Sequence, residues 1–143
     1  MGQGRVPVEL VRGVPVVTAP EEIDVTNADD LRAALLEAGR NGHPNFVVDM
    51  TRTRFCDSYG IHTLARAHRR ALDEHRGMLL AVRHAAVLRV LEITGIGRTI
   101  PSFASVEDAL GQAAGAGTRR PGRTAAPGDA PVSGDVAADG PGA

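Results

Sequence analysis

An apolar run at residues 46–50, followed by a polar break and a serine, is the most informative pattern in the chain. The run is rich in β-branched residues and has no in/out alternation before Asp49, which predicts a strand buried on both faces, as parallel strands are. After the break, Asp57 and Ser58 open an amphipathic segment, as expected at a helix N-terminus. We therefore expect the functional site in this strand-loop-helix stretch.

Apolar positions before this stretch predict a hairpin and a helix. Two β-leaning runs at residues 6–11 and 14–17 are separated by a two-residue turn containing glycine, which favours a hairpin. A helix should follow, opened by a capping box at Asn27 and Asp30 and ended by Gly39. The apolar face of this helix consists of Leu31, Ala34, Leu35 and Ala38.

The helix after Asp57 carries an apolar stripe at helical spacing. The stripe consists of Ile61, Leu64, Ala65, His68 and Leu72. We interpret His68 as a core residue rather than a ligand. The remaining predicted elements are a strand at 78–82, a helix at 86–95, a strand at 100–103 and a helix opened by Ser105. Leu88 and Leu91 are expected in the core.

Strands that alternate with helices indicate an α/β layer fold. After about Ala114 the periodic pattern stops, and the residues are mainly Gly, Ala, Pro, Arg and Asp. Such a segment cannot bury enough apolar surface to offset its ordering entropy. We therefore predict one domain at residues 1–113 and a disordered tail at residues 114–143.

Composition excludes several classes of function. With a formal net charge of -1, the protein has no overall positive charge to attract nucleic acid or anionic lipid. All 16 basic residues are arginines, which excludes a Schiff-base or P-loop lysine. Cys56 is the single cysteine and is expected to be a small buried hydrophobe. No apolar run approaches the ~20 residues that span a bilayer, and the histidines lack zinc-ligand spacing. We expect a cytoplasmic protein without cofactor or metal.

Three spaced motifs resemble one family. They are residues 22–24, residues 47–50 with 55–61, and residues 91–96 with 100–101. In this order they resemble the STAS domain, and within it the bacterial anti-sigma factor antagonists. The resemblance implies a mixed β-sheet with helices packed mainly on one face. It also implies that this protein is not an enzyme but a phosphoprotein that regulates transcription. Its implied partner is an anti-sigma factor with serine kinase activity, to which it binds.

The same resemblance implies that Ser58 is the residue phosphorylated by this partner, and that phosphorylation breaks the complex. Tyr59 departs from the family pattern, in which a small residue stands beside the acceptor. The predicted partner-binding residues are Asp24, Arg52, Arg54, Asp57, Ser58, Tyr59 and Gly60. No direct nucleic-acid or membrane contact is expected. The two arginines are candidates for contact with the partner or with the phosphates of its nucleotide.

The residue types suit this chemistry. A serine in the first turn of a helix lies beside unpaired N–H groups and the positive end of the helix dipole. Asp57 is expected to cap the helix, and Gly60 to let a partner backbone approach closely.

Other interpretations remain open at this point. Asp57 and Ser58 could form only a helix cap, and Asp24 could only orient the first helix. A STAS module that senses a nucleotide or small ligand, or serves as a scaffold without phosphorylation, is the main alternative function. An enzyme that uses Cys56 or a histidine is the third.

Overall fold

A five-stranded mixed sheet forms the centre of the computed structural model, which describes residues 6–116. Its strands are β1 (Val8–Val11), β2 (Val14–Thr18), β4 (Asn45–Met50), β6 (Gly77–Val82) and β7 (Ser102–Phe103), in the order β1-β2-β4-β6-β7. The β1–β2 pair is antiparallel and the other pairs are parallel. A separate parallel pair joins β3 (Glu22–Ile23) to β5 (Phe55–Cys56).

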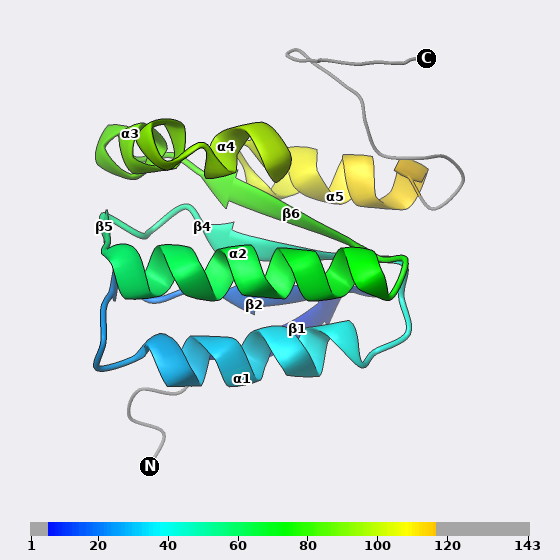
Figure 1. The fold of residues 1–143 in the computed structure, drawn as a ribbon. Coiled ribbons are helices and arrows are strands. Elements are labelled where there is room, and N and C mark those ends of the chain that lie inside the picture. Colours follow the sequence, from blue (N-terminus) through cyan, green and yellow to red (C-terminus); the bar gives the residue numbers. More distant parts are fainter. Residues whose placement is uncertain (1–5, 117–143) are drawn as a thin grey trace.

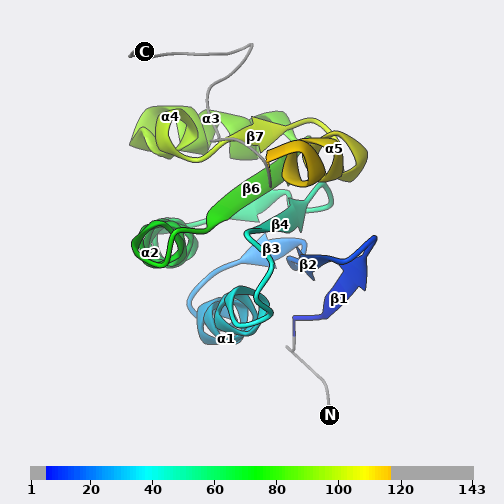
Figure 2. The same cartoon turned by 90° about the vertical axis from the view of Figure 1, so that its right-hand side faces the viewer.

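Helices cover both faces of the sheet unequally (Figures 1 and 2). They are α1 (Ala28–Gly39), α2 (Ser58–Asp73), α3 (Ala85–Thr94), α4 (Ile96–Thr99) and α5 (Val106–Ala116). The first three pack on one face and α5 packs on the other. Strands β2, β4, β6 and β7 follow chain order, so right-handed crossovers place their connecting helices on one side. The α/β fold with helices mainly on one face is therefore confirmed.

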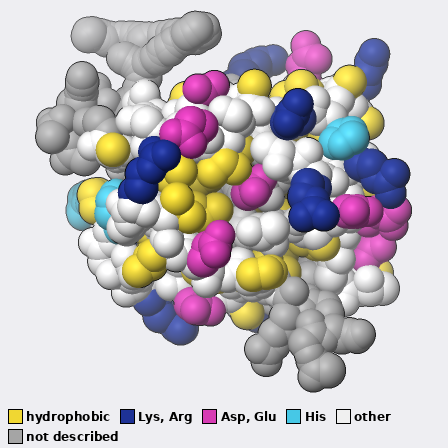
Figure 3. All heavy atoms as spheres, turned by 180° about the vertical axis from the view of Figure 1, so that it is seen from behind, with side chains coloured by type: hydrophobic (Ala, Val, Ile, Leu, Met, Phe, Trp, Pro, Cys, Tyr) yellow, Lys and Arg dark blue, Asp and Glu magenta, His cyan; other side chains and the backbone are white. Residues whose placement is uncertain are grey.

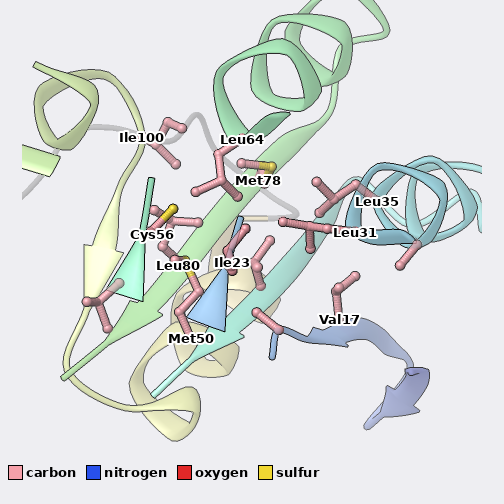
Figure 4. Packing of buried hydrophobic residues seen from close by; sticks show 14 of the residues in the cluster. Val17, Ile23, Leu31, Leu35, Met50, Cys56, Leu64, Met78, Leu80 and Ile100 are labelled. Atoms are coloured by element: carbon pink, nitrogen blue, oxygen red, sulfur yellow. The ribbon is translucent and has the colours of Figure 1, made fainter. Parts of the chain in front are cut away.

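Strand β4 is buried on both faces, as its unbroken apolar pattern predicted. Phe46, Val48 and Met50 pack toward α1 and α2, whereas Val47 packs toward α5. Figure 4 shows Leu31, Leu35 and Leu64 converging on the strand side chains of the larger cluster. On the face that carries α5 and β1, hydrophobic side chains remain visible among charged ones (Figure 3).

The predicted hairpin is confirmed. Val11 pairs with Val14, and the turn residues Arg12 and Gly13 have φ values of 54° and 84°. Two successive positive φ values define a type I′ turn, whose twist matches that of the flanking strands. Gly13 adopts a positive φ without strain, so Arg12 is the one non-glycine residue of this turn in the left-handed region.

The predicted capping box at the start of α1 is wrong. The Asn27 side chain accepts a hydrogen bond from the Asp24 N–H at 3.0 Å and donates one to the Glu22 carbonyl at 2.7 Å. It makes no side-chain cap to the first turn of α1. Asn27 therefore ties β3 to the entry of the helix, a contact with a preceding strand that local spacing could not indicate.

Two apolar positions expected in the core are exposed. Leu72 at the end of α2 is 54% exposed, and its neighbour Ala71 lies inside instead. Leu88 on α3 is 44% exposed, while Val87 and Leu91 are buried. In both helices the apolar stripe is wider than the face that meets the sheet, so one leucine of each stripe points to solvent.

The last helix of the described residues runs past residue 113, where the predicted domain ends. Helix α5 ends at Ala116, beyond residue 113, and its start is capped by the Ser105 hydroxyl, which accepts from the Asp108 N–H at 3.0 Å. The rest of the predicted tail lies outside the described residues. Among the helices of residues 6–116, none combines the length and apolar character needed to cross a membrane.

His68 makes the stability of the fold dependent on pH. It is buried in α2, and burial lowers its pKa below the ordinary value of 6.5. The unfolded chain therefore binds a proton near pH 6.5 that the folded chain binds only at lower pH. Stability contributed by neutral His68 is complete above pH 6.5 and falls as the pH drops toward the folded-state pKa. We expect the stability of His68→Gln to fall less than that of the wild type as the pH drops. Urea unfolding midpoints between pH 7.5 and 5 measure this difference.

His62→Gln is the matched control, because His62 lies on the same helix and is exposed. It should retain the wild-type pH dependence. If both variants follow the wild-type curve, His68 is not the group responsible.

Candidate functional site

The residues singled out from the sequence gather at one end of the sheet, where the parallel strands have their carboxyl ends. Helices α1, α2 and α3 all begin at this end, at the left of Figure 1. Ser58 is the first residue of α2. This arrangement follows from parallel pairing, because each strand ends where the following helix starts.

The loop between β4 and α2 is held at both sides. Next to β4, the Asp49 carboxylate accepts hydrogen bonds from the Thr51 N–H at 3.0 Å and from its hydroxyl at 2.7 Å. Thr53 is fully buried and donates its hydroxyl proton to the Pro20 carbonyl at 2.8 Å. The Arg54 N–H donates to the Glu21 carbonyl at 2.7 Å. The loop is therefore fixed to the segment that leads from β2 into β3.

Asp57 caps α2, as expected. Its carboxylate accepts hydrogen bonds from the N–H groups of Tyr59 at 2.9 Å and Gly60 at 3.2 Å. Its own N–H donates to the Ile23 carbonyl at 3.1 Å, which aligns the helix start with β3. Ser58 is exposed, and within residues 6–116 its hydroxyl makes no hydrogen bond. Asp57 alone therefore caps the helix, and the Ser58 hydroxyl is free to react or to contact a partner.

Asp24 stabilises its own turn. Its carboxylate accepts hydrogen bonds from the hydroxyl and the N–H of Thr26, and these bonds lower the pKa of Asp24. The backbone carbonyl of Asp24 accepts from Asn27 and Ala28 at the start of α1. This geometry favours the interpretation in which Asp24 orients the first helix.

The two arginines before Ser58 both lie near Glu21. Arg54 forms an exposed ion pair with Glu21 at 3.5 Å, close to β3. Arg52 is exposed and lines a hollow of about 190 Å³ with residues 18–21 and Pro7. Ligand pockets usually measure roughly 300–1,000 Å³. Across the part of the chain that the structure describes, no group of three or more His, Cys, Asp or Glu side chains is placed to hold a metal ion.

Comparison with known proteins identifies the family. The STAS domain model matches residues 5–109. This chain belongs to the STAS domain family. A comparison with curated proteins finds no match.

Solved structures of anti-sigma factor antagonists are similar to this STAS domain. One from Mycobacterium paratuberculosis has 30% sequence identity and a TM-score of 0.68, covering 74% of this chain and 90% of that chain. An antagonist STAS domain protein from Planctomyces limnophilus has 21% identity and a TM-score of 0.70, covering 77% and 98%. The Bacillus cell fate determinant SpoIIAA in the phosphorylated form has 20% identity and a TM-score of 0.58, covering 74% and 96%.

Gly60 of this STAS domain has a packing role inside the fold. The residue is buried, and a Cβ atom there would lie 2.6 Å from both the Cys56 Sγ and the Ile23 Cγ2 atoms. The glycine lets the first turn of α2 pack directly on β3 and β5. The side-chain direction at Gly60 is thus filled by the core, and its contact with a partner stays a prediction.

Cys56 is a buried hydrophobe, as predicted. It is 4% exposed and belongs to the main core cluster (Figure 4). Burial, with a smaller contribution from the Asp57 charge, raises the pKa of its thiol to about 12. The thiol is therefore protonated at neutral pH, which disfavours a nucleophilic role.

Sequence reasoning singled out Tyr59 but missed Phe55 and Val25, the other exposed apolar residues near Ser58. Phe55 is 50% exposed and Tyr59 is 55% exposed, and Val25 on the adjacent loop is 59% exposed. The short strand β5 explains Phe55, because successive side chains of a strand point to opposite sides and Cys56 occupies the inner one. The sequence offered one signal for the exposure of Phe55: it directly precedes Cys56, which was predicted to be buried, and neighbouring side chains of a strand point to opposite sides.

Gly60→Ala should destabilise the domain by about 1–3 kcal/mol, because overpacking forces shifts in a core that is already filled. Urea unfolding measures this change. Gly111→Ala is the matched control: Gly111 lies in helix α5, and a Cβ there meets nothing within 4 Å. It should be neutral or stabilising by up to ~1 kcal/mol. Equal effects of the two variants would contradict the close packing at Gly60.

Proposed function

We propose that this STAS domain is an anti-sigma factor antagonist, which binds an anti-sigma factor with serine kinase activity and is released when that partner phosphorylates Ser58. The observation that carries the proposal is the state of Ser58 itself. Its hydroxyl is exposed and uncommitted at the first turn of α2, because Asp57 supplies the helix cap. By this route the protein would regulate transcription that depends on a sigma factor.

The similar structures support this role. The Mycobacterium paratuberculosis relative is an anti-sigma factor antagonist, and it is similar over 74% of this chain. The Bacillus relative with the same fold is known in a phosphorylated form. Neither likeness names the residue in this chain. Ser58 is proposed from the motif resemblance, and its exposed hydroxyl at the start of α2 supports that assignment.

The apolar side chains around Ser58 suit a protein partner. Phe55, Tyr59 and Val25 are each at least half exposed, and aromatic residues are enriched at the centres of interfaces. Helix α3 packs against β5 and adds the exposed Leu88 to this end of the molecule. Together they form an apolar surface that a partner can bury while the Ser58 hydroxyl lies within it.

Phosphorylation would change this surface without changing the fold. The partner transfers the γ-phosphoryl group of ATP to the Ser58 oxygen, the hydroxyl proton is lost and ADP is the other product. The serine gains about -1.5 to -2 charges beside the Asp57 carboxylate. Two N–H groups of the first turn already donate to Asp57, so they are less available to the phosphate. The new charge must then be desolvated in the interface, and a penalty of ~1.4 kcal/mol lowers affinity tenfold.

Tyr59 does not bury the acceptor. Ser58 remains exposed beside its ring, and the Tyr59 N–H is held by Asp57 at 2.9 Å. Arg52 and Arg54 are exposed on the same loop, where they can contact acidic groups of the partner or its nucleotide phosphates. In this proposal the domain acts by binding in the cytoplasm, with no catalysis, cofactor, direct nucleic-acid contact or membrane contact of its own. The hollow beside Arg52 is too small to favour a nucleotide-sensing module.

The first test is phosphorylation by kinase-type anti-sigma factors from the same organism, with ATP and mass mapping of the product. We expect one phosphate, on Ser58, and none on Ser58→Ala. Ser102→Ala, which removes another exposed serine hydroxyl, is the control and should be modified like the wild type. Ser58→Asp should bind the unmodified partner at least tenfold more weakly than Ser58→Ala. Tight binding by Ser58→Asp, with Ser58 unmodified, would reject the switch.

The second test concerns the apolar surface. Phe55→Ala should weaken partner binding by roughly fivefold to thirtyfold, the effect of losing about 1–2 kcal/mol at an interface anchor. Titration calorimetry measures the affinity. Leu72→Ala is the control, because Leu72 is similarly exposed, at 54% against 50%, but lies at the far end of α2. If both variants bind alike, the partner does not use this surface.

A further inference from the structure

A basic groove runs between α1 and α2 from their second turns toward the end of the sheet opposite Ser58. It has a volume of about 150 Å³, and its apolar floor includes Leu35, Phe46 and Ala71. Figure 1 shows the two helices running side by side across this face. The floor residues lie near the start of β4 and the ends of both helices, whereas Ser58 begins α2. The groove and the proposed phosphorylation site are therefore separate surfaces.

The rim of the groove is strongly basic. It carries four arginines and one glutamate, which are Arg32, Arg66, Arg70, Arg76 and Glu74. Arg70 and Arg76 each pair with Glu74, at 3.5 Å and 3.9 Å. Arg32 and Arg66 form no ion pair with any residue that the structure describes. The helix dipole accounts for Arg70 in the last turn of α2, but not for these two residues in helix interiors.

The chain leaves the described fold near this groove. Asn45 at the start of β4 donates a hydrogen bond to the Ala113 carbonyl in the last turns of α5, at 3.2 Å. The next residue, Phe46, lies in the groove floor. Figure 1 shows that α5 ends at the same end of the molecule as α1 and α2. Whatever follows Ala116 therefore starts close to the groove, on the other side of the sheet.

The sequence that follows has complementary charge. Its arginines all lie between residues 119 and 123, and from residue 124 onward the only charged side chains are Asp129, Asp135 and Asp139. Val132 and Val136 lie between these acids, so the segment offers carboxylates for the rim and apolar groups for the floor. The 12 residues at 117–128 can span about 40 Å when extended. That length exceeds the combined thickness of the two helix layers on either side of the sheet, which are about 10–12 Å each.

We propose that residues 129–139 bind in the groove between α1 and α2 of their own chain. Each exposed Arg–Asp pair is weak by itself. A short tether supplies a millimolar effective concentration, so weak contacts suffice for occupancy. A groove of 150 Å³ is smaller than a usual small-molecule pocket, which favours a chain segment lying along it. The groove is thus an intramolecular docking site for an acidic segment.

Paramagnetic relaxation in the full chain tests the proposal. A nitroxide attached through Ser133→Cys reports on the segment, and Cys56 stays unlabelled because it is 4% exposed. In the ¹⁵N spectrum, amides along the groove such as Leu36, Gly39 and Ala67 should lose most of their intensity. Amides of α3 should keep theirs. High salt, which shortens the Debye length to about 3 Å at 1 M, should restore the lost signals.

Charge variants provide the matched comparison. Arg32→Gln with Arg66→Gln should restore the groove signals, whereas Arg83→Gln with Arg89→Gln should not, because that exposed pair lies outside the groove. Equal behaviour of the two double variants, or unaffected groove amides in the labelled wild type, would overturn the proposal. So would equal broadening when the labelled, unenriched chain is mixed with unlabelled ¹⁵N chain, because the tail of a second copy would then be the occupant.

Discussion

The parallel pairing of β4 with β2 on one side and β6 on the other is the constraint on which the rest of the structure depends. A strand buried on both faces needs covering layers, which α1 and α2 supply on one face and α5 on the other. Parallel neighbours also need crossover connections, so helices α1, α2 and α3 follow β2, β4 and β6 and begin at the carboxyl ends of the strands. This brings the starts of α1, α2 and α3 to one end, and Ser58 lies there because it starts α2.

The separation of roles at the start of α2 makes the proposed switch possible. Asp57 accepts hydrogen bonds from two N–H groups of the first turn, and Gly60 lets that turn pack on β3 and β5. The Ser58 side chain is therefore not needed to cap or pack the helix. The loop before it is tied down by Thr53 and Arg54. In the proposed switch, a phosphate added beside this anchored loop would act through its charge. The response of a partner would then depend on local electrostatics rather than on refolding of the domain.

The two ends of the sheet differ in chemistry. The carboxyl ends of the strands present helix N-termini and apolar side chains around Ser58, whereas the amino ends present arginines between α1 and α2. If the acidic segment occupies the basic groove as proposed, it neutralises charge at one end while leaving the other accessible. Docking of the segment and binding of a partner would then be compatible on the same domain.

The sequence by itself determined most of the elements, including where α2 begins. The unbroken apolar run of β4 predicted burial on both faces, and the Asp57-Ser58 pair marked the start of α2, because local hydrogen bonding and periodicity decide these features. Only the tertiary structure decided the contacts between distant segments. The role of Asn27 in bridging to β3, the exposure of Leu72 and Leu88, the enclosure of Gly60 by Ile23 and Cys56, and the apolar surface at Phe55 all depend on which elements pack together. Helical or strand spacing shows which residues share a face, but the neighbouring elements decide how much of that face is covered.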